Sequence, residues 1–174
     1  MQRRAFIGSL MGAIGSGMVA APRAFSNGAG HVIAAEFPPL ATRNLPWHEL
    51  LDREQFQVLF LQDTEFAGSS PLNAERRVGT YVCAACYLPL FHSQHKYASR
   101  TGWPSFTQPI ATHIETRVDR RGREPIVEYH CARCGGHQGH VFDDGPPPRG
   151  ERWCNNGAAL IFVPAADPLP KLRE

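Results

Sequence analysis

The sequence predicts a mainly β domain that begins with short helices and is held together by a structural zinc site of four cysteines. Three observations support this prediction. The 174 residues include 16 glycines and 15 prolines, a composition that favours many turns and few long helices. From residue 79 onward, short apolar runs alternate with Gly, Pro and Asp, as they do in strands joined by turns. Two Cys-x-x-Cys pairs provide the four cysteines.

Residues 1–26 are typical of an export signal rather than of a folded domain. The twin arginine Arg3-Arg4 precedes an uncharged, glycine-rich stretch, residues 6–21, which is short for a transmembrane helix. The tripeptide 24–26 could end the signal. This layout predicts a twin-arginine signal, so we expect an exported, periplasmic protein with no stable membrane insertion after cleavage. An uncleaved membrane anchor and a general secretory signal are the alternatives.

Residues 27–44 predict a flexible linker, because they contain glycines and prolines and little apolar periodicity. Two short helices are predicted next. Between Trp47 and Leu61 apolar residues recur three and four positions apart, and Asp52 to Gln55 could cap the second helix.

Strand signals predict the body of the domain. Short β-branched and aromatic runs occur at residues 80–82, 126–129 and 159–163, with turn residues between them. Residues 165–174 are rich in proline and charge, and we expect them to form a frayed C-terminal tail.

Composition and charge exclude two classes of protein. Hydrophobic residues make up 43% of the chain and charged residues 20%, which excludes a fully disordered chain. The formal net charge is +2, and residues 1–26 contribute three arginines and no acid, so the remainder carries −1. A near-neutral body does not favour electrostatic binding of nucleic acid, and we expect no nucleic-acid partner.

Four of the five cysteines form the pairs Cys83/Cys86 and Cys131/Cys134. Four thiolates at about 2.3 Å satisfy the tetrahedral preference of Zn²⁺ and leave no open coordination position. The pairs therefore predict one structural zinc ion. Two disulfides, or a redox-active dithiol in one pair, are the alternatives.

Cys154 remains without a partner, and its surroundings favour a reactive thiol. Arg152 offers a positive charge two residues away, and Asn156 offers an amide. Upstream, His137 and His140 lie among glycines, and imidazole is suited to proton transfer near neutral pH. These residues predict a nucleophile with an acid–base set. The alternative is a buried small hydrophobe at Cys154 beside structural histidines.

Over residues 45–164 the motifs resemble those of the B-type methionine sulfoxide reductases, which act on methionine-R-sulfoxide. The matching segments agree in order and spacing with that family. They are Gly79–Cys86, Pro89–Phe91, Gly102–Phe106, His137–Pro146 and Arg152–Asn156. The resemblance implies a reductase domain at 45–164, with two antiparallel sheets, peripheral helices and zinc held by the two cysteine pairs.

The resemblance also implies roles for individual residues. Cys154 is the nucleophile, and His137, His140 and Asn156 shape the catalytic site. Trp103 lines the pocket for the methyl group of the substrate, unless it only packs in the core. Arg152 and Phe106 lie in the same motifs and are assigned to the substrate-contacting set. The implied reaction reduces methionine-R-sulfoxide in oxidised proteins or peptides and leaves a sulfenic acid on Cys154.

Two departures from the family pattern affect these expectations. Thr101 stands where many relatives carry a second, resolving cysteine, so we expect an external thiol, from a thioredoxin-like protein or a small molecule, to reduce Cys154. Gln138 and Asn155 replace residues that are usually apolar, and we expect them to make the pocket more polar. A zinc-knuckle binding module and a thiol–disulfide oxidoreductase are the competing functions.

Overall fold

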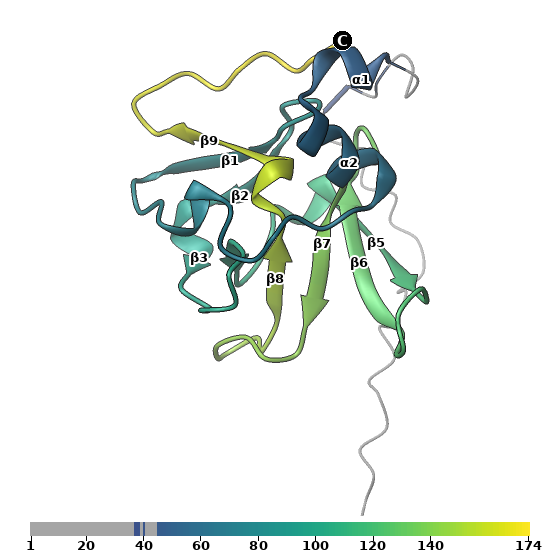
Figure 1. The fold of residues 1–174 in the computed structure, drawn as a ribbon. Coiled ribbons are helices and arrows are strands. Elements are labelled where there is room, and N and C mark those ends of the chain that lie inside the picture. Colours follow the sequence, from purple (N-terminus) through teal and green to yellow (C-terminus); the bar gives the residue numbers. More distant parts are fainter. Residues whose placement is uncertain (1–36, 39, 41–44) are drawn as a thin grey trace, which may run out of the picture. The chain divides into compact units, whose positions relative to one another are not determined.

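The computed structural model describes residues 37, 38, 40 and 45–174. The predicted export signal and most of the predicted linker lie outside the described residues. The architecture is mainly β, with two antiparallel sheets and short helices, as predicted (Figure 1). No helix in the described part of the chain is long and apolar enough to cross a bilayer.

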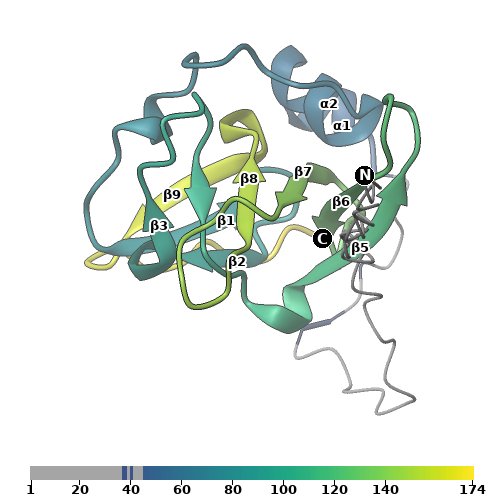
Figure 2. The same ribbon diagram turned by 90° about the horizontal axis from the view of Figure 1, so that it is seen from below.

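The two predicted helices are present, and they pack against each other beside β7 (Figure 2). Helix α1 spans Trp47–Leu50 and α2 spans Arg53–Leu61. Asp52 caps α2: its carboxylate accepts the Gln55 amide, while the Gln55 side chain accepts the Asp52 amide. This reciprocal capping box satisfies two backbone donors that the first turn leaves unpaired, which is why so short a helix begins where it does.

The smaller sheet has three antiparallel strands in the order β2-β1-β9. They span Gly79–Cys83 (β1), Pro89–His92 (β2) and Leu160–Pro164 (β9). The larger sheet has six antiparallel strands in the order β3-β4-β8-β7-β6-β5. They span Lys96–Tyr97 (β3), Ser105–Phe106 (β4), Ile114–Asp119 (β5), Ile126–Cys131 (β6), His137–Phe142 (β7) and Arg152–Asn155 (β8).

Short 3-10 turns connect several of these elements. They span Pro71–Asn73, Ser93–His95, Ala111–His113 and Gly157–Ala159.

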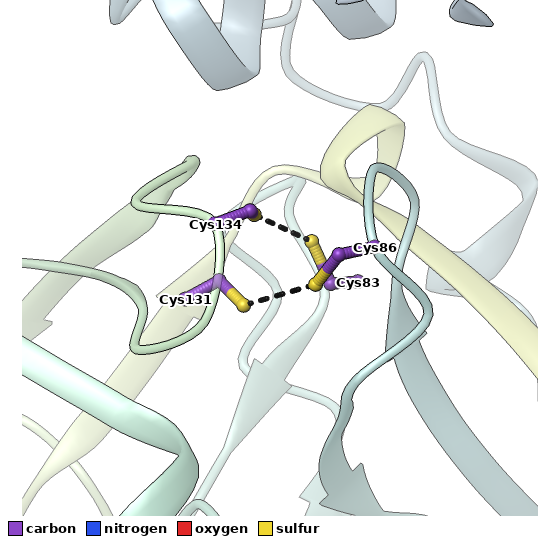
Figure 3. Close-up of side chains that lie close together, drawn as sticks. All are labelled: Cys83, Cys86, Cys131 and Cys134. Atoms are coloured by element: carbon purple, nitrogen blue, oxygen red, sulfur yellow. Dashed lines mark hydrogen bonds between the residues drawn. The ribbon is translucent and has the colours of Figure 1, made fainter. Parts of the chain in front are cut away.

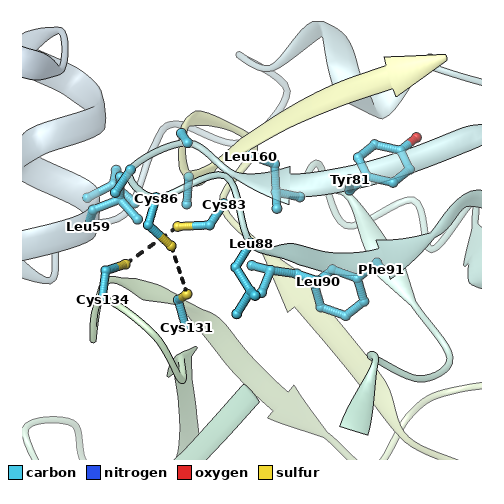
Figure 4. Packing of buried hydrophobic residues seen from close by; sticks show 14 of the residues in the cluster. Leu59, Tyr81, Cys83, Cys86, Leu88, Leu90, Phe91, Cys131, Cys134 and Leu160 are labelled. Atoms are coloured by element: carbon cyan, nitrogen blue, oxygen red, sulfur yellow. Dashed lines mark hydrogen bonds between the residues drawn. The ribbon is translucent and has the colours of Figure 1, made fainter. Parts of the chain in front are cut away.

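Aromatic and aliphatic side chains from both sheets fill the core (Figure 4). Phe91 of β2 stacks on Phe106 of β4 with 4.1 Å between ring centroids, and Tyr81 of β1 meets Phe106 edge to face. Leu88 and Leu90, both fully buried, pack beside the paired cysteines. Fully burying side chains of this size contributes about 1.5–3 kcal/mol each.

Part of the predicted flexible linker is ordered on the body. Phe37 is buried and meets His113 edge to face, with 5.1 Å between the rings. The Arg133 guanidinium donates to the Pro38 carbonyl at 3.0 Å. The expectation of flexibility is therefore wrong at these positions, because the Phe37 ring packs into the body and the Pro38 carbonyl is hydrogen-bonded to it.

The expectation of a frayed C-terminal tail is also wrong. The Arg173 amide donates to the Cys86 carbonyl at 3.1 Å, and Arg133 donates to the Arg173 carbonyl at 2.7 Å. Leu172 packs against the core. The tail lacks secondary structure, but its hydrogen bonds join it to the backbone of one cysteine pair.

Candidate active site and metal centre

The four paired cysteines meet in one buried cluster. The two turns that carry them face each other from opposite sides (Figure 3). Cys83 and Cys134 sulfurs lie 3.7 Å apart, Cys86 and Cys131 sulfurs 3.5 Å apart, and all four lie within 4.8 Å of one another. None of the five cysteines forms a disulfide.

This cluster fits a tetrahedral metal ion. Metal–sulfur bonds of about 2.3 Å in a tetrahedron place the sulfurs about 3.8 Å apart, close to the spacing observed. Burial raises the pKa of the Cys83 and Cys131 thiols, so four thiolates would not form here without a compensating cation. The donor set suits Zn²⁺, and a filled shell leaves no position for a substrate.

Each cysteine turn closes on itself through backbone hydrogen bonds. The Gly135 amide donates to the Cys131 carbonyl at 2.8 Å, and Gly135 adopts a positive φ of 76° that other residues rarely tolerate. The Gly136 amide points at the Cys134 sulfur at 3.4 Å. Such N–H to sulfur contacts stabilise the thiolate form that a metal requires.

A row of polar side chains crosses the larger sheet and includes Cys154. Cys154 on β8 lies opposite His140 on β7 and, on its other side, opposite Ser105 on β4. His140 lies opposite Glu128 on β6, and Glu128 opposite Arg117 on β5. Residues opposed across antiparallel strands project from the same face with Cβ atoms about 4.5–5.5 Å apart. These five residues are called the polar row below.

Close backbone approach holds the middle of this row together. A Cβ added to Gly139 would lie 1.9 Å from the Cys154 carbonyl oxygen, so β7 and β8 can sit this close only with glycine there. The contact fixes the strand that carries His140 against the strand that carries Cys154.

Cys154 is half-buried, and burial raises the pKa of its thiol. Three neighbours oppose this effect, namely the Arg152 guanidinium and the side-chain hydrogen bonds of Ser105 and Thr101. Arg152 is held in place by two hydrogen bonds to Asp144, at 2.7 and 3.0 Å. The thiol is therefore protonated at rest but lies beside a fixed positive charge that stabilises its anion.

His137 is backed by a buried carboxylate. Its Nδ1 lies 2.6 Å from Glu128, which also accepts two hydrogen bonds from Arg117, at 2.7 and 3.1 Å. Burial lowers the pKa of His137, and the hydrogen bonds from Arg117 and His137 hold the pKa of Glu128 low although burial acts to raise it. An ionised Glu128 thus holds a proton on Nδ1 of His137 and leaves Nε2 as an acceptor.

His140 has a second carboxylate of its own. Its Nε2 lies 3.3 Å from Asp119, and Arg121 donates to Asp119 at 3.0 and 2.8 Å. The Arg121 hydrogen bonds keep the pKa of Asp119 well below its usual range. The side chain of His140 is 22% exposed, whereas that of His137 is 1% exposed, so His140 is the histidine that can meet an incoming molecule.

Asn156 and Trp103 are joined through the backbone of Glu65. The Glu65 amide donates to the Asn156 side chain at 3.2 Å, and the Trp103 indole donates to the Glu65 carbonyl at 3.1 Å. The Glu65 carboxylate accepts the amides of Gly157 and Ala158, both at 2.7 Å. One residue of the loop after α2 therefore fixes the indole relative to the end of β8.

Two sequence expectations about side-chain direction are wrong. Phe106 is fully buried and stacks on Phe91, so it belongs to the core and cannot contact a substrate. Gln138 and Asn155 are also fully buried, and Asn155 donates to Gln138 at 3.3 Å. Alternation along a strand explains both errors. Ser105 and Cys154 lie opposite each other and point to one face of the sheet, whereas the next residue along each strand, Phe106 or Asn155, points to the other face.

Sequence reasoning missed the residues behind the histidines, Glu128 and Asp119, and the linking residue Glu65. Glu128 could have been found, because a single acid inside the apolar run 126–129 indicates a buried charge that needs a partner. Nothing comparable marks Asp119 or Glu65. Their roles depend on strand register and on a contact between residues more than 90 positions apart.

The two sites together define a class of protein. It is a small two-sheet β domain that combines a buried cluster of four cysteines able to hold a metal ion with a separate thiol facing a histidine, an arrangement that suits a thiol-dependent enzyme. Comparison with known proteins identifies the family within this class.

A family model described as the SelR domain matches residues 51–164. The peptide methionine sulfoxide reductase MsrB of Pseudomonas putida (strain W619) is 48% identical over 120 residues, covering 68% of this chain and 90% of that protein. MsrB of Xylella fastidiosa (strain M23) is 41% identical over 134 residues, covering 76% and 86%. The chain belongs to the SelR-domain family, the B-type methionine sulfoxide reductases, and is an oxidoreductase.

Proposed function

We propose that this chain reduces methionine-R-sulfoxide in oxidised proteins or peptides, with Cys154 as nucleophile. The observation that carries the proposal is the strand register, which sets Cys154 opposite His140 on one face of the larger sheet. The R configuration rests on the resemblance to the family and on no feature of the geometry.

The proposed chemistry balances within the site. The Cys154 sulfur attacks the sulfoxide sulfur and forms a sulfur–sulfur bond to it. The protonated oxygen then moves from the substrate sulfur to the Cys154 sulfur, so the substrate's sulfur–oxygen bond breaks as a new one forms. The sulfur–sulfur bond breaks at the same time, methionine leaves with its electron pair, and Cys154 has become a sulfenic acid. The thiol loses one proton and the oxygen gains one, so an imidazole beside the thiol can carry the proton from one to the other.

His140 is proposed as this relay and His137 as its support. His140 faces Cys154 and is partly exposed, whereas His137 is buried against Glu128. The two rings meet edge to face with centroids 5.3 Å apart. Trp103 is proposed to hold the methyl group of the substrate, and Arg152 to stabilise the Cys154 anion.

The paired cysteines are proposed to hold one zinc ion with a structural role. When bound, the ion ties two distant turns together, and the reaction needs no further chemistry from it. Folding before export through a twin-arginine route would load these thiols in a reducing compartment, which agrees with the proposed periplasmic location.

An external thiol is proposed to restore Cys154. The four other cysteines belong to the cluster, and the loop between β3 and β4 presents Thr101, not a thiol, to the Cys154 sulfur as a hydrogen-bond partner. Two thiols of a thioredoxin-like protein, or two small thiols, would reduce the sulfenic acid to thiol and water and become a disulfide.

Turnover of the two separated epimers of a methionine sulfoxide peptide tests this function. We expect reduction of the R epimer only, and complete loss of it in Cys154→Ser. His140→Ala should lower kcat about a hundredfold with little change in KM, and His137→Ala should lower it less. His48→Ala, at an exposed histidine on α1, is the matched control. Reduction of the S epimer, or a larger loss in His137→Ala than in His140→Ala, would contradict the assignments.

A further inference from the structure

A chain of buried amide side chains runs from the cysteine cluster to the strand of the nucleophile. The Gln138 side chain on β7 donates to the Cys83 sulfur at 3.6 Å. Its carbonyl oxygen accepts the Asn155 amide at 3.3 Å, and Asn155 directly follows Cys154 on β8. Both amides are fully buried, so the contacts join the two sites through the interior of the domain.

Asn155, at the other end of this row of amides, is also held by hydrogen bonds. The Asn155 oxygen accepts the Tyr129 hydroxyl at 2.8 Å, and the Asn155 amide also donates to the Asn156 carbonyl at 2.8 Å. The Asn156 side-chain amide donates to the main-chain carbonyl of Gln138 at 3.1 Å. Each side chain polar atom of Asn155 and Gln138 therefore has a partner, which buried amides require because an unpaired one is costly.

We propose that Gln138 and Asn155 are positioning residues that couple metal retention at Cys83 to the placement of Cys154. An N–H donated to a thiolate sulfur stabilises the metal-bound form, and outer partners of metal ligands commonly change affinity 10–100-fold. The hydrogen bonds of the Asn155 side chain go to Tyr129, Gln138 and Asn156, so it acts on Cys83 through the Gln138 side chain. The coupling rests on the zinc ion of the proposed function.

Release of zinc to a chromogenic chelator tests the coupling without any turnover. Purified full-length protein is compared with Gln138→Met, Asn155→Leu and the double variant, which keep side-chain size and remove the amides. We expect about tenfold faster release in each single variant. The double variant should also release about tenfold faster, and not about a hundredfold, because both residues act through one link.

Two comparisons separate coupling from simple loss of stability. Val163→Ala, in a buried position of β9, is the control for destabilisation, and its release rate should stay near that of the wild type at a similar fall in Tm. If the single variants do not fold, the double variant carries the test, because replacing both partners with apolar groups removes the unpaired amide. Gln138→Met should also lower kcat about fivefold with unchanged KM.

The outcomes are distinct. Wild-type release rates in Asn155→Leu and the double variant, or effects that multiply in the double variant, would overturn the coupling. A wild-type protein without stoichiometric zinc would overturn the metal assignment itself, and with it the coupling.

Discussion

The four paired cysteines and Cys154 carry the same side chain in two opposite settings. The paired sulfurs are buried, turn toward one another and are enclosed by the core, with Leu88 and Leu90 beside them (Figure 4). The Cys154 sulfur is half-buried and lies among polar groups, with His140 opposite it and Arg152 nearby. A closed set of four thiols suits a structural metal site, whereas a single thiol beside an imidazole suits nucleophilic chemistry, and these are the roles that we propose for the two settings.

The difference extends to how each setting handles charge. In the cluster, burial raises the pKa of the Cys83 and Cys131 thiols, so charge on four thiolates would have to be met by a cation. Around Cys154, charge is distributed over two arginine–carboxylate–histidine chains, one through Glu128 of the polar row to His137 and one through Asp119 to His140. A site built in this second way can change protonation without losing its structure, which catalysis by proton transfer requires.

The strongest test of the contrast exchanges one sulfur for oxygen in each setting. Cys154→Ser should abolish sulfoxide reduction, by at least about a thousandfold, because hydroxyl is a far weaker nucleophile. Tm and zinc content should stay at wild-type values. Steady-state kinetics, calorimetry and elemental analysis measure the three quantities, and a lower zinc content in this variant would place Cys154 in the metal site.

The reciprocal exchange, Cys131→Ser, should act mainly on the fold. The variant should lose its zinc and its Tm should fall by more than about 10 °C, since binding of a structural metal contributes folding free energy. Treatment of the wild type with a chelator should produce the same shift. Full stability with no zinc would show that the cluster is not structural.

Glu128 tests the polar row. Glu128→Gln should cost roughly 2 kcal/mol at pH 7, below the value for a fully buried pair because the Arg117 partner is half exposed. The pKa of Glu128 is lowered in the folded state, so its contribution is present above the ordinary value near 4.5 and disappears as the pH falls further. Urea unfolding should therefore show that the difference in unfolding free energy between the wild type and Glu128→Gln shrinks from pH 7 to pH 3. A constant difference across this range would mean that Glu128 is not ionised in the fold.

The smallest expected effect concerns the anion of Cys154. Arg152→Met should slow alkylation of Cys154 by iodoacetamide about threefold at pH 8, because the guanidinium lowers the pKa of the thiol against the effect of burial. Arg149→Met, at an exposed arginine in the preceding loop, should leave the rate unchanged. Equal rates in all three proteins would remove Arg152 from the account of thiol reactivity.

Features that depend on local spacing can be predicted from the sequence, whereas contacts that depend on the register between strands cannot. The Asp52–Gln55 cap, the strands at 80–82 and 126–129, and the two cysteine pairs follow from spacing alone, and the structure confirms them. The partners of His137 and His140 could not be predicted, since they depend on pairing across β5, β6 and β7, with an irregularity beside Tyr129.

The wrong expectations for Phe106 and Asn155 have the same origin. A motif gives the order of residues along a strand, but one step along it reverses the face of the sheet to which a side chain points. Phe37 and Arg173 show a second limit of prediction from sequence. Their contacts, with His113 and with the Cys86 carbonyl, are to segments far away in the sequence. Functional residues named by motif therefore need the register before a role can be given to them.

Gly139 restricts how this protein can change. The three nearest heavy atoms that a first side-chain carbon would meet there belong to the backbone of the neighbouring strand, which has no rotamer to move aside. Even alanine would force β7 away from β8 beside Cys154. We therefore expect laboratory evolution of this enzyme to keep glycine at position 139.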